Sequence, residues 1–163
     1  MISARASRHT PAIVTVLLAL MLTLVPLPEN LAPFRPDWVV LILIYWAMTA
    51  PGDYNVGSAF VIGILLDVAQ GTLLGQHALA LCVIVYITIK FHLLMRVFPL
   101  LQLTATVFAL LTLYQFLLFW INGVAAVTAP TIGYWAPVIT GAIVWPFLSM
   151  FLSGVRFRAQ TKG

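Results

Sequence analysis

The chain has 163 residues, of which 63% are hydrophobic and 7% are charged, with a formal net charge of +4. Charged residues make up about a quarter of an ordinary soluble domain, so this composition excludes a soluble globular protein and indicates an integral membrane protein. The length has room for about six membrane spans of roughly 20 residues each. We therefore expect a single all-α, polytopic membrane domain.

The few charged and sulfur-bearing residues exclude several other classes. The Lys and Arg residues form no basic stripe interleaved with aromatic residues, so we expect no nucleic-acid partner. The single cysteine, Cys82, lies in an apolar run and offers neither a disulfide nor a zinc site. We expect no cofactor.

Six apolar segments predict six transmembrane helices joined by short turns. They span about residues 11–26, 36–50, 55–70, 76–92, 99–121 and 134–154. The first follows a polar stretch with Arg5 and Arg8 and ends at Pro26-Leu27-Pro28 without a small-residue cleavage pattern. We therefore expect a retained span and not a signal peptide.

The second and third segments are short. The second would reach only about 20 Å at 1.5 Å per residue, against a hydrocarbon core of about 30 Å. Two short neighbours joined at Pro51-Gly52-Asp53 favour a hairpin buried against other helices. Local thinning of the bilayer, with Trp38 and Tyr54 at the interfaces, fits the same pattern.

The distribution of basic residues predicts the orientation. With six spans, one side of the membrane carries Arg5, Arg8, Lys90, Arg96, Arg156, Arg158 and Lys162, and the other carries Arg35 alone. Because cytoplasmic loops are enriched in Lys and Arg, we expect both termini to be cytoplasmic.

Asp67 is the one acid well inside an apolar segment. Ala59, Gly63 and Asp67 are four residues apart and share one helix face. Small residues let another helix approach closely, so we expect this face to contact a partner protein. We expect Gly63→Leu to abolish that association without preventing membrane insertion.

Because Arg35 is the only basic residue on the outer side, we also predict an Arg35–Asp67 ion pair. Alternatively, Asp67 lies near a helix end and caps or pairs locally.

Recognisable catalytic patterns are missing from the sequence. An intramembrane aspartyl protease needs two acids that share a proton. Asp37 lies at a helix start, so Asp67 has no second acid beside it within an apolar segment. His77 and His92 lie toward opposite ends of one span, which separates them too far to ligate one metal ion. The serines lack a nucleophile elbow, and there is no phosphate-binding loop. We therefore expect no enzyme.

A central block of motifs resembles the MreD family of bacterial rod shape-determining proteins. It comprises Phe34-Arg35-Pro36-Asp37-Trp38, Asn55-Val56-Gly57, Phe60-x-x-Gly63-x-x-x-Asp67 and Gly71-x-x-Leu74-Gly75, with Trp145-Pro146 before a basic tail. The Phe-Arg-Pro-Asp-Trp stretch is similar to the proteobacterial branch of that family. The resemblance covers nearly the whole chain, although the first and fourth spans match only as apolar segments.

The resemblance implies a non-enzymatic inner-membrane component of the elongation machinery, which helps control peptidoglycan synthesis and rod shape. It implies MreC as the main partner, with the filament protein MreB and with RodA and its transpeptidase in the same machinery. It also implies a fold similar to the six-helix substrate-binding subunits of energy-coupling-factor transporters, so a vitamin-like carrier is the alternative function. The implied structural or partner-binding residues are Arg35, Pro36, Asp37, Trp38, Gly63, Asp67, Gly71 and Gly75.

Overall fold

The structure, a computed structural model, describes residues 2–125 and 132–161, with side chains for 10–125 and 133–158. Over these residues it is all-helical, as predicted, with six α-helices and two short 3₁₀ helices. The α-helices are α1 (Ile2–Leu24), α2 (Trp38–Thr49), α3 (Val56–Gln70), α4 (Gln76–Val97), α5 (Leu100–Val124) and α6 (Ala136–Thr161). The 3₁₀ helices are η1 (Ala32–Phe34) and η2 (Ile132–Trp135).

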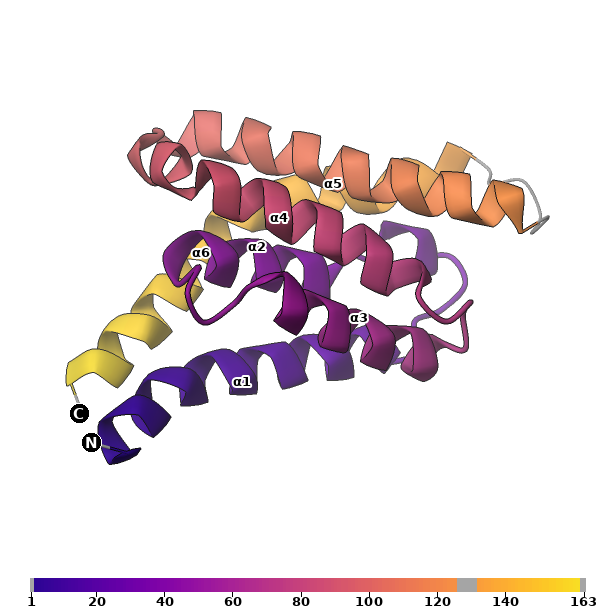
Figure 1. The fold of residues 1–163 in the computed structure, drawn as a ribbon. Coiled ribbons are helices and arrows are strands. Elements are labelled where there is room, and N and C mark those ends of the chain that lie inside the picture. Colours follow the sequence, from indigo (N-terminus) through magenta and orange to yellow (C-terminus); the bar gives the residue numbers. More distant parts are fainter. Residues whose placement is uncertain (1, 126–131, 162–163) are drawn as a thin grey trace.

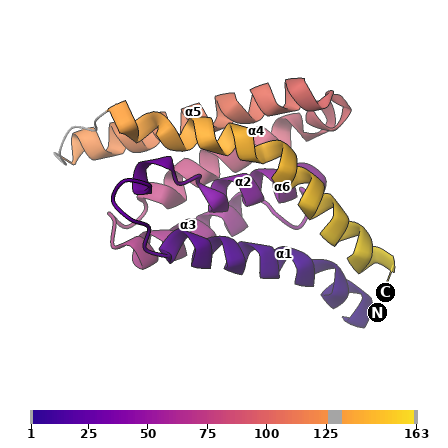
Figure 2. The ribbon, with the colours of Figure 1, turned by 180° about the vertical axis from the view of Figure 1, so that it is seen from behind.

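Successive helices run back and forth along one long direction (Figure 1). The start of α1 and the end of α6 lie together at one end of the bundle, which we call the terminal end (Figures 1 and 2). The α1–α2 connection and the α3–α4 turn lie at the opposite end, which we call the loop end (Figure 1). Asp67, near the end of α3, and Arg35, just before α2, are therefore at the same end, as the six-span prediction requires.

α2 is the central helix. Every residue from Val39 to Met48 is buried, and the helix contacts α1, α4 and α6. A helix that is apolar on all sides is stable only when it is buried on all sides. Its 12 residues span only about 18 Å, but because α2 does not face lipid it need not match the thickness of the bilayer.

The buried α2 is tied to its neighbours by side-chain hydrogen bonds. Trp46 Nε1 donates to Thr15 Oγ1 in α1 at 3.0 Å, and Tyr45 Oη donates to Ser153 Oγ in α6 at 3.3 Å. At its C-terminus, Arg96 of α4 donates from Nε to the Met48 carbonyl at 3.0 Å and from Nη2 to the Thr49 carbonyl. A cation at this position satisfies carbonyls that lack intrahelical partners and complements the helix dipole.

α3 differs from α2 because only one of its faces is covered. Its buried residues are Ala59, Gly63, Leu66 and Asp67, whereas Phe60 and Val61 are more than half exposed. Asn55 caps its start, since the side chain accepts hydrogen bonds from the N–H groups of Gly57 and Ser58. Burial against other helices therefore holds for the whole of α2 but for one side of α3 only.

Among the described residues, three helical segments are long and apolar enough to cross a membrane: Gln76–Val97, Leu100–Val124 and Gly133–Arg158. Thr10–Leu24 and Val56–Gln70 are shorter apolar helices. α6 bends along its length (Figure 2), and Pro146 lies inside it. Proline removes a backbone hydrogen bond and clashes with the preceding turn, which accounts for the bend.

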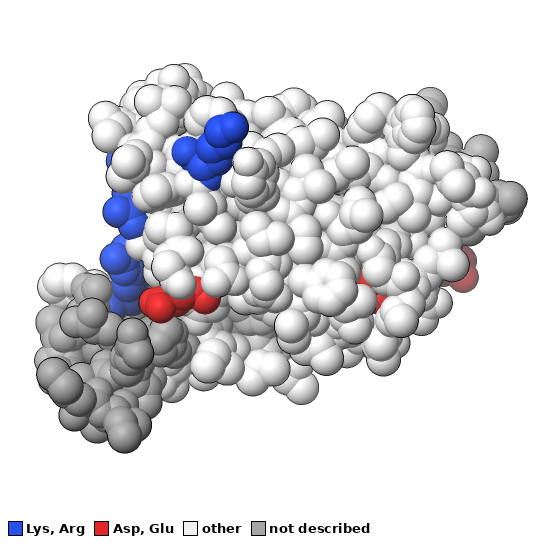
Figure 3. Space-filling model, viewed as in Figure 1, with Lys and Arg blue, Asp and Glu red and all other residues white. Residues whose placement is uncertain are grey.

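The outer surface is largely apolar and uncharged. Large hydrophobic side chains such as Leu17, Val68, Leu93 and Phe147 are about half exposed or more. Figure 3 shows Lys and Arg near the terminal end of the face in view, with most of the remaining surface white. Such a surface is suited to a hydrocarbon solvent and not to water.

The described basic side chains are unevenly placed along the bundle. Lys90 and Arg96 lie in the last turns of α4, and Arg156 and Arg158 lie in the last turns of α6, both of which end at the terminal end. Among the side chains described, that of Arg35 is the only basic one at the loop end. The side chains of Arg5 and Arg8, and Lys162 as a whole, lie outside the described residues.

Candidate functional site

Asp67 is fully buried, and its carboxylate is held at the start of α4. Oδ1 accepts hydrogen bonds from the His77 N–H at 2.9 Å and from Thr72 Oγ1 at 3.0 Å, and it lies 2.7 Å from His77 Nδ1. Oδ2 accepts from the Gly75 N–H at 2.8 Å and the Ala78 N–H at 3.4 Å. The first N–H groups of a helix have no intrahelical acceptor, so a carboxylate is well placed there. Asp67 thus caps the next helix along the chain.

Two glycines make this capping possible. Gly71 has a φ of +65° and ends α3, where the Thr72 N–H returns to the Asp67 carbonyl at 3.1 Å. Gly75 has a φ of +96° and immediately precedes α4. Side-chain-bearing residues rarely adopt such angles. Gly71 and Gly75 therefore permit a tight turn between α3 and α4. This turn places the first N–H groups of α4 next to the Asp67 carboxylate.

His77 is the functional side chain that the sequence reasoning missed. The sequence predicts only that it lies toward one end of a span, but it is buried and forms an ion pair or hydrogen bond with Asp67. Its ring also lies 6.3 Å from that of Tyr114 in α5, centroid to centroid. The available signal was an acid near a helix end, followed by a glycine-bounded turn and a histidine in the first turn of the next helix.

The predicted Arg35–Asp67 ion pair is wrong. Nη2 of Arg35 donates to the main-chain carbonyls of Leu22 and Val25 at the end of α1. Both residues are described, and their side chains contact different partners. The physical reason is that the last carbonyls of α1 lack intrahelical N–H donors and carry the negative end of the helix dipole, while N–H groups already surround Asp67.

Gly63 faces a helix of this same chain. A Cβ atom at Gly63 would lie 2.3 Å from Ala78 Cα and 2.7 Å from the Ala78 nitrogen. The prediction that this face permits close helix contact is confirmed. The helix that approaches Gly63 is α4 of this chain, where a partner protein was expected. A leucine there would disrupt the bundle itself.

The remaining predicted residues surround the start of α2. Asp37 is its N-cap residue but makes no side-chain capping hydrogen bond. The Pro36 carbonyl accepts from the Trp38 N–H at 2.9 Å, and Trp38 packs against the core as a partly buried residue. The block Arg35 to Trp38 therefore joins the end of α1 to the start of α2.

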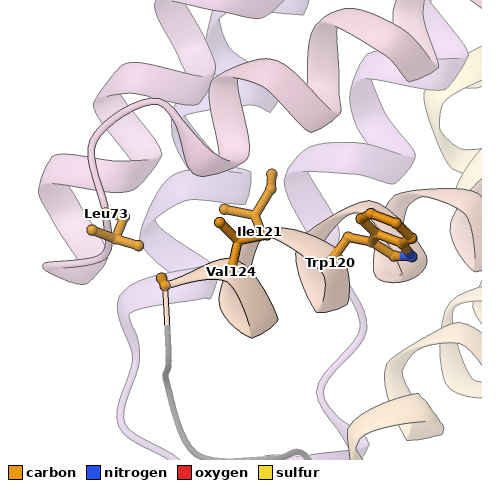
Figure 4. A pocket seen from close by; sticks show the side chains of 5 residues that line it. Leu73, Trp120, Ile121 and Val124 are labelled. Carbon is orange, nitrogen blue, oxygen red and sulfur yellow. The ribbon is translucent and has the colours of Figure 1, made fainter.

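An apolar groove of ≈ 350 Å³ opens at the loop end of α5. It is lined by Leu73, Trp120, Ile121, Val124 and Ala125. Figure 4 shows Leu73 of the α3–α4 turn across from Ile121 and Val124 of α5. None of these side chains is a nucleophile, acid or base, so the groove itself offers no catalytic group.

The described residues include no cluster of three or more His, Cys, Asp or Glu side chains that could hold a metal ion. The hydroxyl beside the Asp67–His77 pair is that of Thr72, which donates to the carboxylate at 3.0 Å and lies 3.3 Å from His77 Nδ1. The arrangement is suited to joining helices. Fold and site together define a polytopic α-helical membrane protein whose most prominent polar cluster is a buried interhelical cap.

Comparisons with known proteins identify a family within this class of membrane proteins. A family model for rod shape-determining protein MreD matches residues 6–155, so the chain belongs to the MreD family. A rod shape-determining protein MreD from Haemophilus influenzae is 37% identical over 79 residues, covering 48% of this chain and 49% of that protein. The match thus spans about half of the relative's length, and the relative is proteobacterial, as the motif block predicted. No solved structure matches this chain, so its likeness to energy-coupling-factor transporter subunits stays a prediction.

Proposed function

We propose that this chain is a non-enzymatic component of the inner-membrane machinery that controls peptidoglycan synthesis and rod shape. Its main partner is the single-span protein MreC, and it acts alongside MreB, RodA and the transpeptidase of RodA. The supporting observation is the family match over residues 6–155, together with a buried acid whose hydrogen bonds are all made within the bundle. As a single domain spanning residues 1–163, the chain serves as a membrane scaffold.

The proposed orientation has both termini in the cytoplasm. Two observations support it: α1 begins and α6 ends at the same end of the bundle (Figure 1), and four of the five described basic side chains lie in helix ends there. Cytoplasmic segments next to membrane spans are enriched in Lys and Arg. The loop end, with Arg35 and Asp67, then faces the periplasm.

A vitamin-like carrier finds less support in the residues described. Pockets for small organic ligands usually have volumes of about 300–1,000 Å³ and a few convergent polar groups. The groove of ≈ 350 Å³ has only apolar lining side chains apart from the indole of Trp120. The polar cavity beside His77 is only ≈ 10 Å³.

Affinity purification of the tagged chain from native membranes tests the scaffold proposal. We expect MreC to co-purify in detergent, and the Gly154→Ala variant to behave as the wild type because the added Cβ atom would meet nothing within 4 Å beyond the backbone of its own helix. Recovery of transporter energising subunits in place of elongation proteins would contradict the proposal and favour the carrier.

A further inference from the structure

A small polar cavity lies beside the buried start of α2. It has a volume of ≈ 10 Å³, about the room that one water molecule needs. Its lining comes from all of the first five α-helices or their caps: Thr23, Asp37, Val39, Val40, Leu66, Gln70, His77 and Tyr114. The cavity is therefore a meeting point of helices at the loop end.

Several hydrogen-bonding groups around this cavity are left without partners among the described residues. The first N–H groups of a helix have no intrahelical acceptor, and the Asp37 side chain does not cap α2. Val39 and Val40 are 2% and 1% exposed, and within the described part of the chain no main-chain acceptor outside the helix reaches their N–H groups. Buried N–H groups without a partner are rare in folded proteins.

Tyr114 supplies a second, independent observation. It is 1% exposed and lines the cavity, yet the hydrogen bonds between described residues include none to its hydroxyl. The Nδ1 atom of His77 is engaged by Asp67, which leaves Nε2 for a further partner. The Asp37 carboxylate provides acceptors, so donors and acceptors both converge on the cavity.

We propose that this cavity holds one ordered water molecule. The water accepts one hydrogen bond from the N–H groups in the first turn of α2 and connects Tyr114, Asp37 and His77, which makes four hydrogen bonds in all. An anion of similar size is disfavoured by the Asp37 carboxylate, and a metal cation is disfavoured by the N–H groups and the positive end of the α2 dipole. A neutral molecule that both donates and accepts fits both sets of groups. Through His77, the water joins the start of α2 to the Asp67 cap of α4.

Water–amide NMR on the full chain, labelled with ¹⁵N-valine and held in lipid nanodiscs, tests this site. We expect the Val39 and Val40 amides to show cross-peaks with the sign of a long-lived bound water. Tyr114→Phe should weaken or abolish these cross-peaks because it removes one of the water's partners. Tyr86→Phe is the matched control, because Tyr86 is 56% exposed and should leave them unchanged.

Three results would overturn the proposal. Wild-type amides without water cross-peaks would show that the cavity is dry. Amide shifts that change when choline replaces sodium, or gluconate replaces chloride, would identify an ion in place of water. Cross-peaks at full strength in Tyr114→Phe would remove Tyr114 from the site. The wild-type spectrum decides the main point even if the variant does not fold.

Discussion

At the scale of single residues, the buried charge of Asp67 is stabilised by hydrogen-bond donors from the α3–α4 turn and from the start of α4. The donors are the N–H groups of Gly75, His77 and Ala78, the Thr72 hydroxyl and the His77 ring. Removing the carboxylate leaves these buried and partly buried groups without this acceptor. Burying an unpaired polar group is among the few mechanisms that produce large losses of stability.

We expect Asp67→Ala to lower the free energy of unfolding by roughly 2–4 kcal/mol, because hydrogen bonds to a buried charge are lost together. The midpoint of unfolding in detergent, followed by the helical signal, measures this loss. Glu29→Ala is the control, since Glu29 is exposed in the α1–α2 connection. Equal midpoints for the two variants would contradict the capping role.

Two double-mutant cycles distinguish the true partner of Asp67 from the one that the sequence suggested. The Asp67→Ala and His77→Ala cycle should show a coupling energy of about 1 kcal/mol or more, because the two side chains are in direct contact. The Asp67→Ala and Arg35→Ala cycle should be additive, since Arg35 binds carbonyls of α1. Strong coupling to Arg35 would restore the original ion-pair hypothesis.

At the scale of helices, the α3–α4 pair depends on the absence of a side chain at Gly63. We expect Gly63→Ala to lower the stability by roughly 1–3 kcal/mol, because the added methyl group forces the helices apart. Thermal unfolding in detergent measures it. Gly154→Ala adds the same methyl group in α6 where nothing lies within 4 Å, so it should be neutral or slightly stabilising. A neutral Gly63→Ala would mean that α3 and α4 are not in close contact.

The Arg96 cap of α2 is a second test at this scale. We expect Arg96→Gln to destabilise the bundle by roughly 1–3 kcal/mol, because the Met48 and Thr49 carbonyls lose a charged donor. Lys90→Gln removes a basic residue from the same helix and serves as the control in the same unfolding assay. Identical effects would show that Arg96 acts through net charge alone.

Much of the element pattern could be predicted from the sequence, because apolar runs and glycine or proline turns mark membrane helices directly. The Ala59-Gly63 face could be predicted for the same reason, since helical periodicity reveals which residues share a side. The partners of Asp67 and Arg35 could not. Asp67 pairs with His77 across a turn, where no periodicity applies, and Arg35 and Arg96 bind main-chain carbonyls that no side-chain pattern reveals.

At the scale of the whole molecule, the fold places the short α2, buried from Val39 to Met48, within longer helices whose outer faces are apolar. This arrangement brings both ends of the chain to the terminal end of the bundle (Figures 1 and 2). We expect reporters fused to either terminus to give a cytoplasmic signal, because Lys and Arg side chains gather at that end. A periplasmic signal from the C-terminal fusion would contradict the even number of passes.

Depletion of the chain in the bacterium that encodes it tests the central claim, its role in rod shape, most directly. Cell width and length are measured while a plasmid supplies the wild type, Asp67→Ala or Gly154→Ala. We predict that depleted cells become wider and rounder, and that the wild type and Gly154→Ala restore the rod shape. Asp67→Ala should restore it poorly, because less of this variant is folded in the membrane. Depleted cells that keep a normal width and continue to elongate would contradict the account.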